Sequence, residues 1–314
     1  MKTTGVYASR MKALTAFSLA VLLVAGCREA PKEKAPEKAP DKPRADAVEA
    51  HRTEIAKWQE GRATRLKAED GWLSLIGLFW LNEGKNVISI PSAGSPTVKV
   101  TRHGGVVTLE PGAAMMIEGK PVSTPTALKN DAEEKGPTVV QMGSVRFQVI
   151  KRGEKYGLRV KDANAHTRTN FLGLDYYPTD PKWRVEARFE AYKPEKKIPI
   201  TDVTGMTSDN ISPGALVFTV DGKEYRIDPV LEEGTDELFI IFKDATSRDE
   251  TYQPGRYLYA AKPGPDGKTV IDFNKAYNPP CSFTPFATCP LPPLQNRLPI
   301  RIEAGEKRYA GGHA

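Results

Sequence analysis

The sequence predicts an all-β fold, mainly an antiparallel barrel or sandwich, with one N-terminal helix. Two observations lead to this prediction. Apolar and charged residues alternate with a period of two along several short stretches, most clearly from Trp183 to Ala191. Turn residues separate such stretches at Gly104-Gly105, at Asp221-Gly222 and near Asp266-Gly267. Strands do not alternate with helix-length segments, so a parallel sheet with crossover helices is not expected.

The helix is expected from about Val48 to Glu69, where Ile55, Trp58 and Leu66 supply apolar contacts and most other positions are charged or small. This apolar stripe is weak, which predicts a helix lying across the surface of the domain. Beyond Gly84 the period falls to that of strands.

Several strands can be placed individually. In residues 183–191 every second side chain is apolar and those between are charged, as in a strand with one face in water. Residues 145–149 follow the same pattern. Residues 238–242, Leu-Phe-Ile-Ile-Phe, are apolar on both faces and predict a central strand. Residues 255–260 are expected to pair with residues 269–274.

The N-terminus predicts a bacterial lipoprotein signal peptide over residues 1–26. A basic start precedes an apolar run from Leu14 to Ala25, which is too short for a membrane span, and the segment ends Val-Ala-Gly before Cys27. Cys27 would then be the lipidated first residue and anchor the chain to the membrane. The alternative is an ordinary signal peptide with an incidental cysteine. Arg28, rather than Asp, favours the outer membrane of a two-membrane cell, with the domain facing the periplasm.

Residues 27–46 are expected to be a tether rich in Pro, Lys and Glu. Four prolines stand among alternating charges, and no apolar stripe is available for burial. At about 3.1 Å per residue, an extended polyproline II segment of this length could reach roughly 60 Å. Residues 47–314 would form a single β-rich domain.

The charge balance argues against nucleic acid as a partner. The formal net charge of the whole chain is +6. Three of the 45 basic residues and none of the 39 acidic ones lie in residues 1–26, so the rest of the chain is near +3. Such a balanced surface gives little reason to expect nucleic-acid binding.

Familiar catalytic and metal-binding motifs do not occur. The sequence contains no G-x-S-x-G, no P-loop, no G-x-G-x-x-G after a strand, no H-E-x-x-H and no paired C-x-x-C. None of the four histidines, His51, His103, His166 and His313, is spaced to share a metal with another. No metal or cofactor is therefore expected, and the sequence leaves open whether the protein is an enzyme.

The most unusual segment runs from Asp272 to Arg297 and reads DFNKAYNPPCSFTPFATCPLPPLQNR. Together with GWLSLIGLFWLNEGKN at residues 71–86, FKDATSRDETY at residues 242–252 and GRYL at residues 255–258, it resembles domain-of-unknown-function family 1684. The resemblance extends over most of the chain after the signal peptide. The family has no established activity, so the resemblance implies relatives without implying a reaction.

Cys281 and Cys289 are the only cysteines besides Cys27. In an oxidising compartment a disulfide between them is the first expectation, and so small a loop would add about 2–3 kcal/mol through chain entropy. Their place in the family signature makes a purely structural disulfide less secure, because relatives without export signals would keep both thiols reduced. Buried inert thiols, metal ligands or one reactive thiolate are the alternatives.

Polar residues cluster after two of the predicted strands and are candidates for ligand binding. They are Asp244, Glu250, Tyr252, Arg256, Asp272, Asn274, Tyr277 and Asn278. An arginine with carboxylates, tyrosines and amides could hold a carboxylate, a phosphate or a sugar. The alternative is structural, since Asn and Asp side chains also cap the backbone of proline-rich loops. The aromatics Trp72, Phe79 and Trp80 could likewise stack on a sugar or only cover one end of a barrel.

Two functions fit these observations. The favoured one is a lipid-anchored ligand-binding or interaction module of the cell envelope, with its pocket near Arg256, Asp272 and Tyr277. The alternative is an enzyme acting on a small anionic molecule or glycan, with Asp244, Glu250 or Asp272 as acid and base.

Overall fold

The computed structural model describes residues 45–311. The predicted signal peptide, Cys27 and the tether up to residue 44 lie outside the described residues. Within residues 45–311, no helix has the length and apolar character needed to cross a membrane.

The long helix α1 (Ala45–Lys67) confirms the predicted N-terminal helix, with each end within three residues of the expectation. It buries Ile55 and Leu66, as expected, but also His51 and Arg62. The weak apolar stripe is thus explained by a buried face that carries polar groups, each of which has a partner described below. A short 3-10 helix, η1 (Trp72–Ser74), follows.

Two antiparallel sheets, here called the first sheet pair, follow the helix. One has the order β1-β10-β9-β8-β5-β6 and the other β2-β3-β4-β7. Their strands are β1 (Leu75–Trp80), β2 (Gly84–Ser89), β3 (Thr97–His103), β4 (Val106–Leu109), β5 (Met116–Ile117), β6 (Lys120–Pro121), β7 (Thr126–Leu128), β8 (Val140–Met142), β9 (Val145–Arg152) and β10 (Lys155–Asp162). Val100 and Leu109 of one sheet meet Phe147 and Leu158 of the other in a common apolar core.

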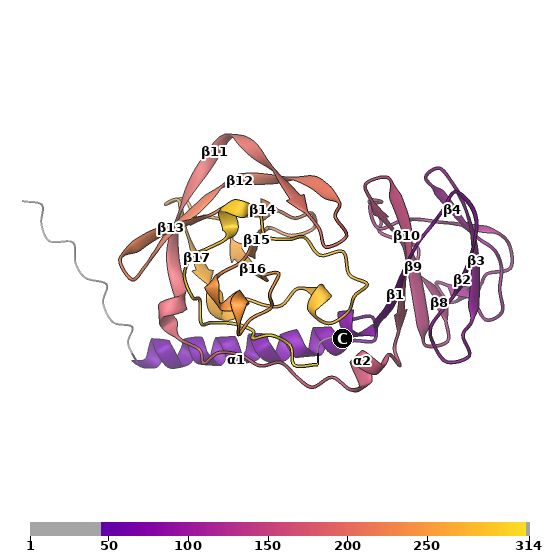
Figure 1. The fold of residues 1–314 in the computed structure, drawn as a ribbon, viewed down its shortest axis with the longest axis horizontal. Coiled ribbons are helices and arrows are strands. Elements are labelled where there is room, and N and C mark those ends of the chain that lie inside the picture. The colour runs from indigo at the N-terminus through magenta and orange to yellow at the C-terminus, as the bar shows by residue number, and fades with distance from the viewer. Residues whose placement is uncertain (1–44, 312–314) are drawn as a thin grey trace, which may run out of the picture. The chain divides into compact units, whose positions relative to one another are not determined.

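Two further antiparallel sheets, the second sheet pair, have the orders β13-β12-β11-β17 and β14-β15-β16. Their strands are β11 (Arg184–Thr201), β12 (Thr207–Val220), β13 (Lys223–Ile227), β14 (Val230–Leu231), β15 (Glu237–Phe242), β16 (Arg256–Ala261) and β17 (Lys268–Asp272). Ala187, Phe218, Ile240 and Leu258 share their core. In Figure 1, α1 runs along this sheet pair.

The mainly antiparallel all-β fold is confirmed, and the alternation predicted over residues 183–191 holds as far as Arg188, after which Phe189 and Glu190 are both half-buried and Ala191 is exposed. Trp183, Val185 and Ala187 are buried while Arg184 and Glu186 are exposed. β15 is the central strand of its sheet, and four of its residues are nearly inaccessible to solvent. Gly104-Gly105 connects β3 to β4, and the left-handed residues Asp221 (φ 50°) and Gly222 (φ 74°) connect β12 to β13.

The expected pairing of residues 255–260 with residues 269–274 is wrong. β16 pairs with β15, and β17 pairs with β11 through registers such as Ala187↔Thr269. The link between the two strands contains Pro263 and Pro265, which cannot donate ladder hydrogen bonds. The chain therefore crosses from one sheet to the other at this turn.

After β17 the described chain contains only short 3-10 helices, η4 (Phe273–Lys275), η5 (Pro280–Ser282) and η6 (Leu294–Asn296). Elsewhere the short helices are α2 (His166–Thr169), η2 (Pro181–Trp183) and η3 (Ala245–Arg248). Isolated bridges fasten this C-terminal segment to the strands, among them Tyr257↔Tyr277 and Lys243↔Arg297. Many of its side chains are buried, so it is an ordered cover on the second sheet pair.

Candidate functional site

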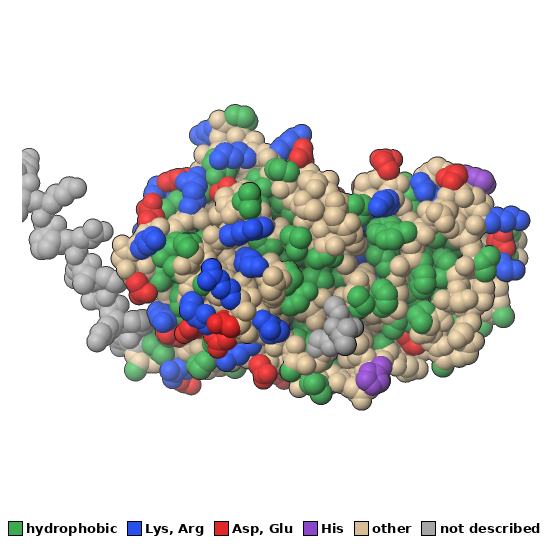
Figure 2. Space-filling model, in the orientation of Figure 1, with side chains coloured by type: hydrophobic (Ala, Val, Ile, Leu, Met, Phe, Trp, Pro, Cys, Tyr) green, Lys and Arg blue, Asp and Glu red, His purple; other side chains and the backbone are tan. Residues whose placement is uncertain are grey.

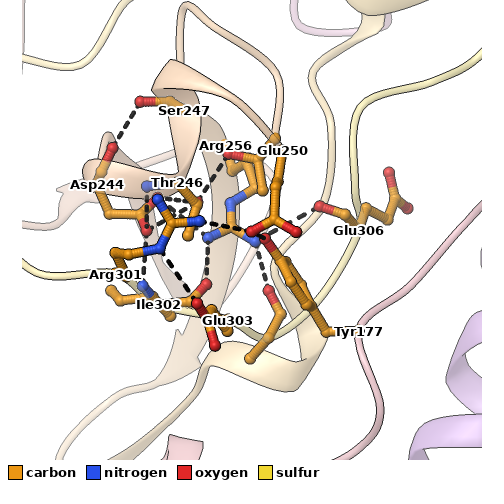
Figure 3. Close-up of polar contacts among 12 residues, drawn as sticks. Tyr177, Asp244, Thr246, Ser247, Glu250, Arg256, Arg301, Ile302, Glu303 and Glu306 are labelled. Carbon is orange, nitrogen blue, oxygen red and sulfur yellow. Dashed lines mark hydrogen bonds and ion pairs between the residues drawn. The ribbon is translucent and has the colours of Figure 1, made fainter.

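Arg256 and Asp244, both expected at a ligand site, form a buried ion pair instead. Arg256 is 1% exposed, and its Nη2 lies 3.1 Å from Asp244 Oδ1. The guanidinium also donates to the carbonyls of Ile302 (3.0 Å) and Ala304, while Asp244 accepts the Ile302 amide at 2.7 Å. Figure 3 shows Arg256 enclosed between Asp244 and the 302–306 segment. This pair anchors the end of the chain to β16.

Asn274 and Asn278 are also occupied by the backbone. Asn274 accepts the Asp180 amide and donates to the Asp180 carbonyl, both at 3.0 Å. Asn278 donates to the Lys307 carbonyl at 2.7 Å. Arg256 does not share these contacts, because it donates to Asp244 and to backbone carbonyls of residues 302–306. Both asparagine side chains therefore hydrogen-bond to the backbone, as in the structural alternative given in the sequence analysis.

Glu250 and Tyr252 bind protein groups as well. Glu250 accepts from the Tyr177 hydroxyl at 3.0 Å and from Arg301 at 2.5 Å (Figure 3). Tyr252 donates to the Cys281 carbonyl at 3.0 Å. Neither residue lines the main cavity described next.

Of the eight ligand-binding candidates, Asp272 and Tyr277 line a cavity with a volume of about 800 Å³, to which Trp72 and Cys289 also contribute. Its walls come from α1, η1, β9, β10, β11, β15 to β17 and the C-terminal segment. Six cationic residues line it, Arg62, Arg65, Arg152, Arg159, Arg184 and Lys275, against the three acids Glu232, Glu237 and Asp272. Figure 2 shows Lys and Arg side chains gathered beside Asp and Glu on the surface of the second sheet pair.

Most of these cations already have a carboxylate partner. Arg62 Nε lies 2.9 Å from Glu306 Oε1. Lys275 is paired with Glu54, and Arg184 Nε lies 3.8 Å from Asp272. These pairs fix the walls and leave little charge for a ligand.

Two of the six cations have no ion pair among the described residues, the exposed Arg65 of α1 and the buried Arg159 of β10. Arg159 is 8% exposed, and no carboxylate of the described residues forms an ion pair with it. Its Nε is buried without a hydrogen-bond partner in the described chain, and its only hydrogen bond there is a long one from Nη2 to Thr288 Oγ1, at 3.5 Å. The nearby Asp131 is engaged by Arg152 at 2.9 Å.

The electrostatics of Arg159 follow from this burial. Desolvation, with a smaller contribution from the charge of Arg152, lowers the pKa of Arg159 to about 10. The guanidinium therefore stays charged at neutral pH. Its carbon lies 5.3 Å from the centroid of the Trp72 ring, a cation–π contact that compensates only part of the lost hydration. An anion in the cavity would supply the missing partner.

Thr288 links Arg159 to Arg152. Its hydroxyl accepts from Arg152 Nε at 3.2 Å as well as from Arg159. Two guanidinium groups thus meet at one threonine, and all three side chains line the cavity. Planar guanidinium groups suit carboxylate and phosphate oxygens.

Asp272 is the best placed of the predicted acids, but its oxygens are occupied. Oδ2 lies 2.7 Å from His51 Nε2, and Oδ1 accepts the amide of Asn274 at 3.1 Å. His51, to which the sequence assigned no partner, therefore helps to hold α1 against η4.

Aromatic side chains form another wall. Tyr259 stacks on Phe239 at 5.0 Å between centroids, and lies 6.3 Å from Tyr277 with the rings nearly parallel. Arg62 lies 4.7 Å from the centroid of Tyr277. Burial raises the pKa of Tyr259 and of Tyr277, so both hydroxyls are protonated at neutral pH and can donate.

Cys281 and Cys289 are both buried, and no disulfide bond joins them in the structure. They are neighbours, since the Cys281 amide donates to Cys289 Sγ at 3.1 Å. A hydrogen bond with the Cys289 thiol lowers the pKa of Cys281. Oxidation of the pair in an oxidising compartment stays a prediction. Among the described residues no cluster of His, Cys, Asp or Glu is arranged to hold a metal ion.

The cationic cavity residues were not found from the sequence. One signal was available: Arg159 stands between Leu158 and Val160 in a strand whose residues 156–160 are all buried. A charged residue inside such a strand needs a partner or a ligand. For Arg62, on a helix full of charges, the sequence held no comparable signal.

Comparisons with known proteins agree with the resemblance in the sequence. Residues 169–307 match the model of a family described as "Protein of unknown function (DUF1684)", which supports this domain family for the second sheet pair and the C-terminal segment. The match begins at residue 169, although the resemblance was expected over most of the chain.

A solved structure is also similar. It is the solution NMR structure of an uncharacterised protein from gene locus rrnAC0354 of Haloarcula marismortui, 29% identical, with a TM-score of 0.39. The similarity covers 46% of this chain and 80% of that one. No curated protein matches.

Proposed function

We propose that the protein binds a small anionic molecule in the cavity, with Arg159 as the main anchor. The observation that carries this proposal is a buried guanidinium without a carboxylate partner in the described chain. A buried charge that remains unpaired lowers the stability of the fold, so an anion that pairs with it gains a strong interaction. Arg152 and Thr288 lie beside Arg159 in the cavity and would contact the same anion.

Binding is favoured over catalysis by the positions of the carboxylates. Asp244 and Glu250, which the enzyme hypothesis uses as acid and base, do not line the cavity. Asp272 does, but His51 and Asn274 occupy its oxygens. The acid and base proposed from the sequence therefore do not face a common ligand.

We further propose that this binding takes place in the cell envelope, with the domain held at the membrane by a lipid on Cys27. The support lies in the sequence, where Val-Ala-Gly-Cys ends a short apolar run. A tether of about 19 residues would let the cavity reach solutes at a distance from the bilayer.

The test is a binding titration with simple acids. Trp58 and Trp72 line the cavity, so their fluorescence should report occupancy. We expect at least one acid among acetate, benzoate, glucuronate and glucose 6-phosphate to bind saturably. Arg159→Gln should weaken it by about 10- to 100-fold, because hydrogen bonds to charged groups contribute roughly 1.5–3 kcal/mol.

Arg226→Gln is the matched control, since Arg226 is a paired arginine on β13 outside the cavity. It should leave the affinity unchanged. The proposal fails if no acid binds, or if Arg159→Gln binds as well as the original protein. Melting temperatures of all three proteins separate loss of binding from loss of fold.

A further inference from the structure

We infer that the ligand is an acidic sugar, a hydroxylated ring that carries one carboxylate or phosphate group. This inference rests on the proposed function, because it takes the contact with Arg159 as given. It adds which chemical groups of the ligand the other lining residues of the cavity would select. Three observations support it. They are the volume of the cavity, the acidic residues Glu232 and Glu237 in its lining, and the contacts that already cover the faces of its aromatic rings.

The cavity is larger than an isolated anion requires. Its volume of about 800 Å³ lies in the range, roughly 300–1,000 Å³, of sites that enclose a whole small molecule. The anionic group held at Arg159 is therefore one end of a larger ligand. The remaining volume must match the other lining residues.

Those other residues include carboxylates that can accept further hydrogen bonds. Glu232 accepts from the Tyr259 hydroxyl, and Glu237 also lines the cavity. A carboxylate offers about four acceptor positions, so Glu232 can accept further donors. Its charge would repel a second anionic group. Hydroxyl groups, which donate without carrying charge, fit this wall.

The aromatic residues are poorly placed for a flat ligand. Tyr259 already stacks on Phe239, and Arg62 lies over Tyr277 at 4.7 Å. Arg159 and Lys161 lie over Trp72 at 5.3 and 5.7 Å. These contacts occupy ring faces that an aromatic acid would need for stacking. The phenolic hydroxyl groups and ring edges suit a polar, non-planar ring.

The experiment compares five probes by calorimetric titration of the full protein: glucuronate, glucose 6-phosphate, glucose, benzoate and γ-aminobutyrate. One of the two acidic sugars should bind at least 10-fold more tightly than benzoate or γ-aminobutyrate. Glucose, which has no anionic group for Arg159, should bind far more weakly than the two acidic sugars. Which acidic sugar wins tells carboxylate from phosphate.

Two substitutions at the wall complete the test. Glu232→Ala and Tyr259→Phe should each weaken the acidic sugar about 10-fold while benzoate changes less than 2-fold, because benzoate has no hydroxyl for that wall. Glu233→Ala is the control, since Glu233 is exposed next to Glu232 and does not line the cavity.

The outcomes separate this inference from the proposed function. If benzoate or the zwitterionic γ-aminobutyrate binds as tightly as the acidic sugars, or if Glu232→Ala has no effect on them, the sugar assignment is overturned while anion binding at Arg159 stands. If no probe depends on Arg159, both are overturned.

Discussion

Two buried arginines of this protein, Arg256 and Arg159, differ in the partners that surround their guanidinium groups. Arg256 is matched by Asp244 and by three backbone carbonyls. Arg159 has Thr288 at 3.5 Å and the face of Trp72. The first arrangement is that of a structural ion pair, and the second is the one that we propose binds an anion. Partners distinguish them, since exposure does not.

Arg256→Ala should strongly destabilise the fold. It leaves Asp244 charged and buried at 4% exposure, and losing one member of such a pair typically costs about 3–5 kcal/mol. Urea unfolding at neutral pH measures the loss. Arg226→Ala, an exposed control, should change stability by less than about 1 kcal/mol. A loss below 1 kcal/mol for Arg256→Ala would contradict the bracing role.

The C-terminal segment singled out in the sequence borders the cavity, but most of its candidate residues bind other groups of the protein. Asp272 and Tyr277 do line the cavity. Asn274 and Asn278 serve the backbone, as Asn commonly does in loops that lack their own ladder. Which polar residues face a cavity depends on tertiary partners such as Glu306 and Lys307, which lie about 30 residues further along the chain.

At the level of elements, α1 is attached to the second sheet pair by ion pairs on one face. His51 meets Asp272, Arg62 meets Glu306 and Glu54 meets Lys275. Successive contacts are three and eight residues apart, about one and two turns of helix, so one side of the helix is presented throughout. Ile55 and Leu66 add apolar contact on the buried face.

The exposed pair between Glu54 and Lys275 should make a small, pH-dependent contribution. The hydrogen bond from Lys275 lowers the pKa of Glu54 below its ordinary value. A lowered carboxyl pKa stabilises the fold above the unfolded-state value and loses that contribution as pH falls through the folded-state value. Glu54→Gln should therefore cost less than about 1 kcal/mol at pH 7 and nothing once the pH is well below 4.5.

Urea midpoints of the original protein and Glu54→Gln between pH 7 and pH 3 measure this difference. A difference that grows as the pH falls would show that the sign is wrong. Glu60→Gln is a suitable control, because Glu60 is an exposed carboxylate of the same helix with no ion pair among the described residues.

Strands and hairpins were predictable where local pattern decides them. The alternation in β11 and the Asp-Gly turn after β12 both depend on neighbouring residues alone. The pairing partner of β17 could not be predicted from local pattern, because a turn near Asp266-Gly267 fits both a hairpin and a crossing between sheets. The choice depends on β11, about 80 residues earlier, which offers β17 an edge.

On the scale of the whole molecule, the fold class followed from the sequence and the cavity did not. α1, β10, β16 and the C-terminal segment each contribute to its lining, and the lining residues are separated by up to about 230 positions. No local pattern reports that these surfaces meet. The division at residues 26 and 46 stays a prediction.

Membrane attachment is tested through Cys27. Mass spectrometry of the protein from its native cell should show an N-terminal Cys27 carrying lipid, because Val-Ala-Gly-Cys follows the apolar run. Cys27→Ser should leave the precursor unprocessed at this site. An unmodified N-terminus, or a product released into the soluble fraction, would contradict the lipid anchor.

The most direct test of the central claim is a crystal structure of the protein with its tightest-binding acid. An oxygen of the acid should lie about 2.7–2.9 Å from the guanidinium of Arg159, the usual length of a charge-assisted hydrogen bond. Thr288 and Arg152 should stay beside it. An acid bound elsewhere, or a cavity in which Arg159 turns to a protein carboxylate instead, would contradict the account.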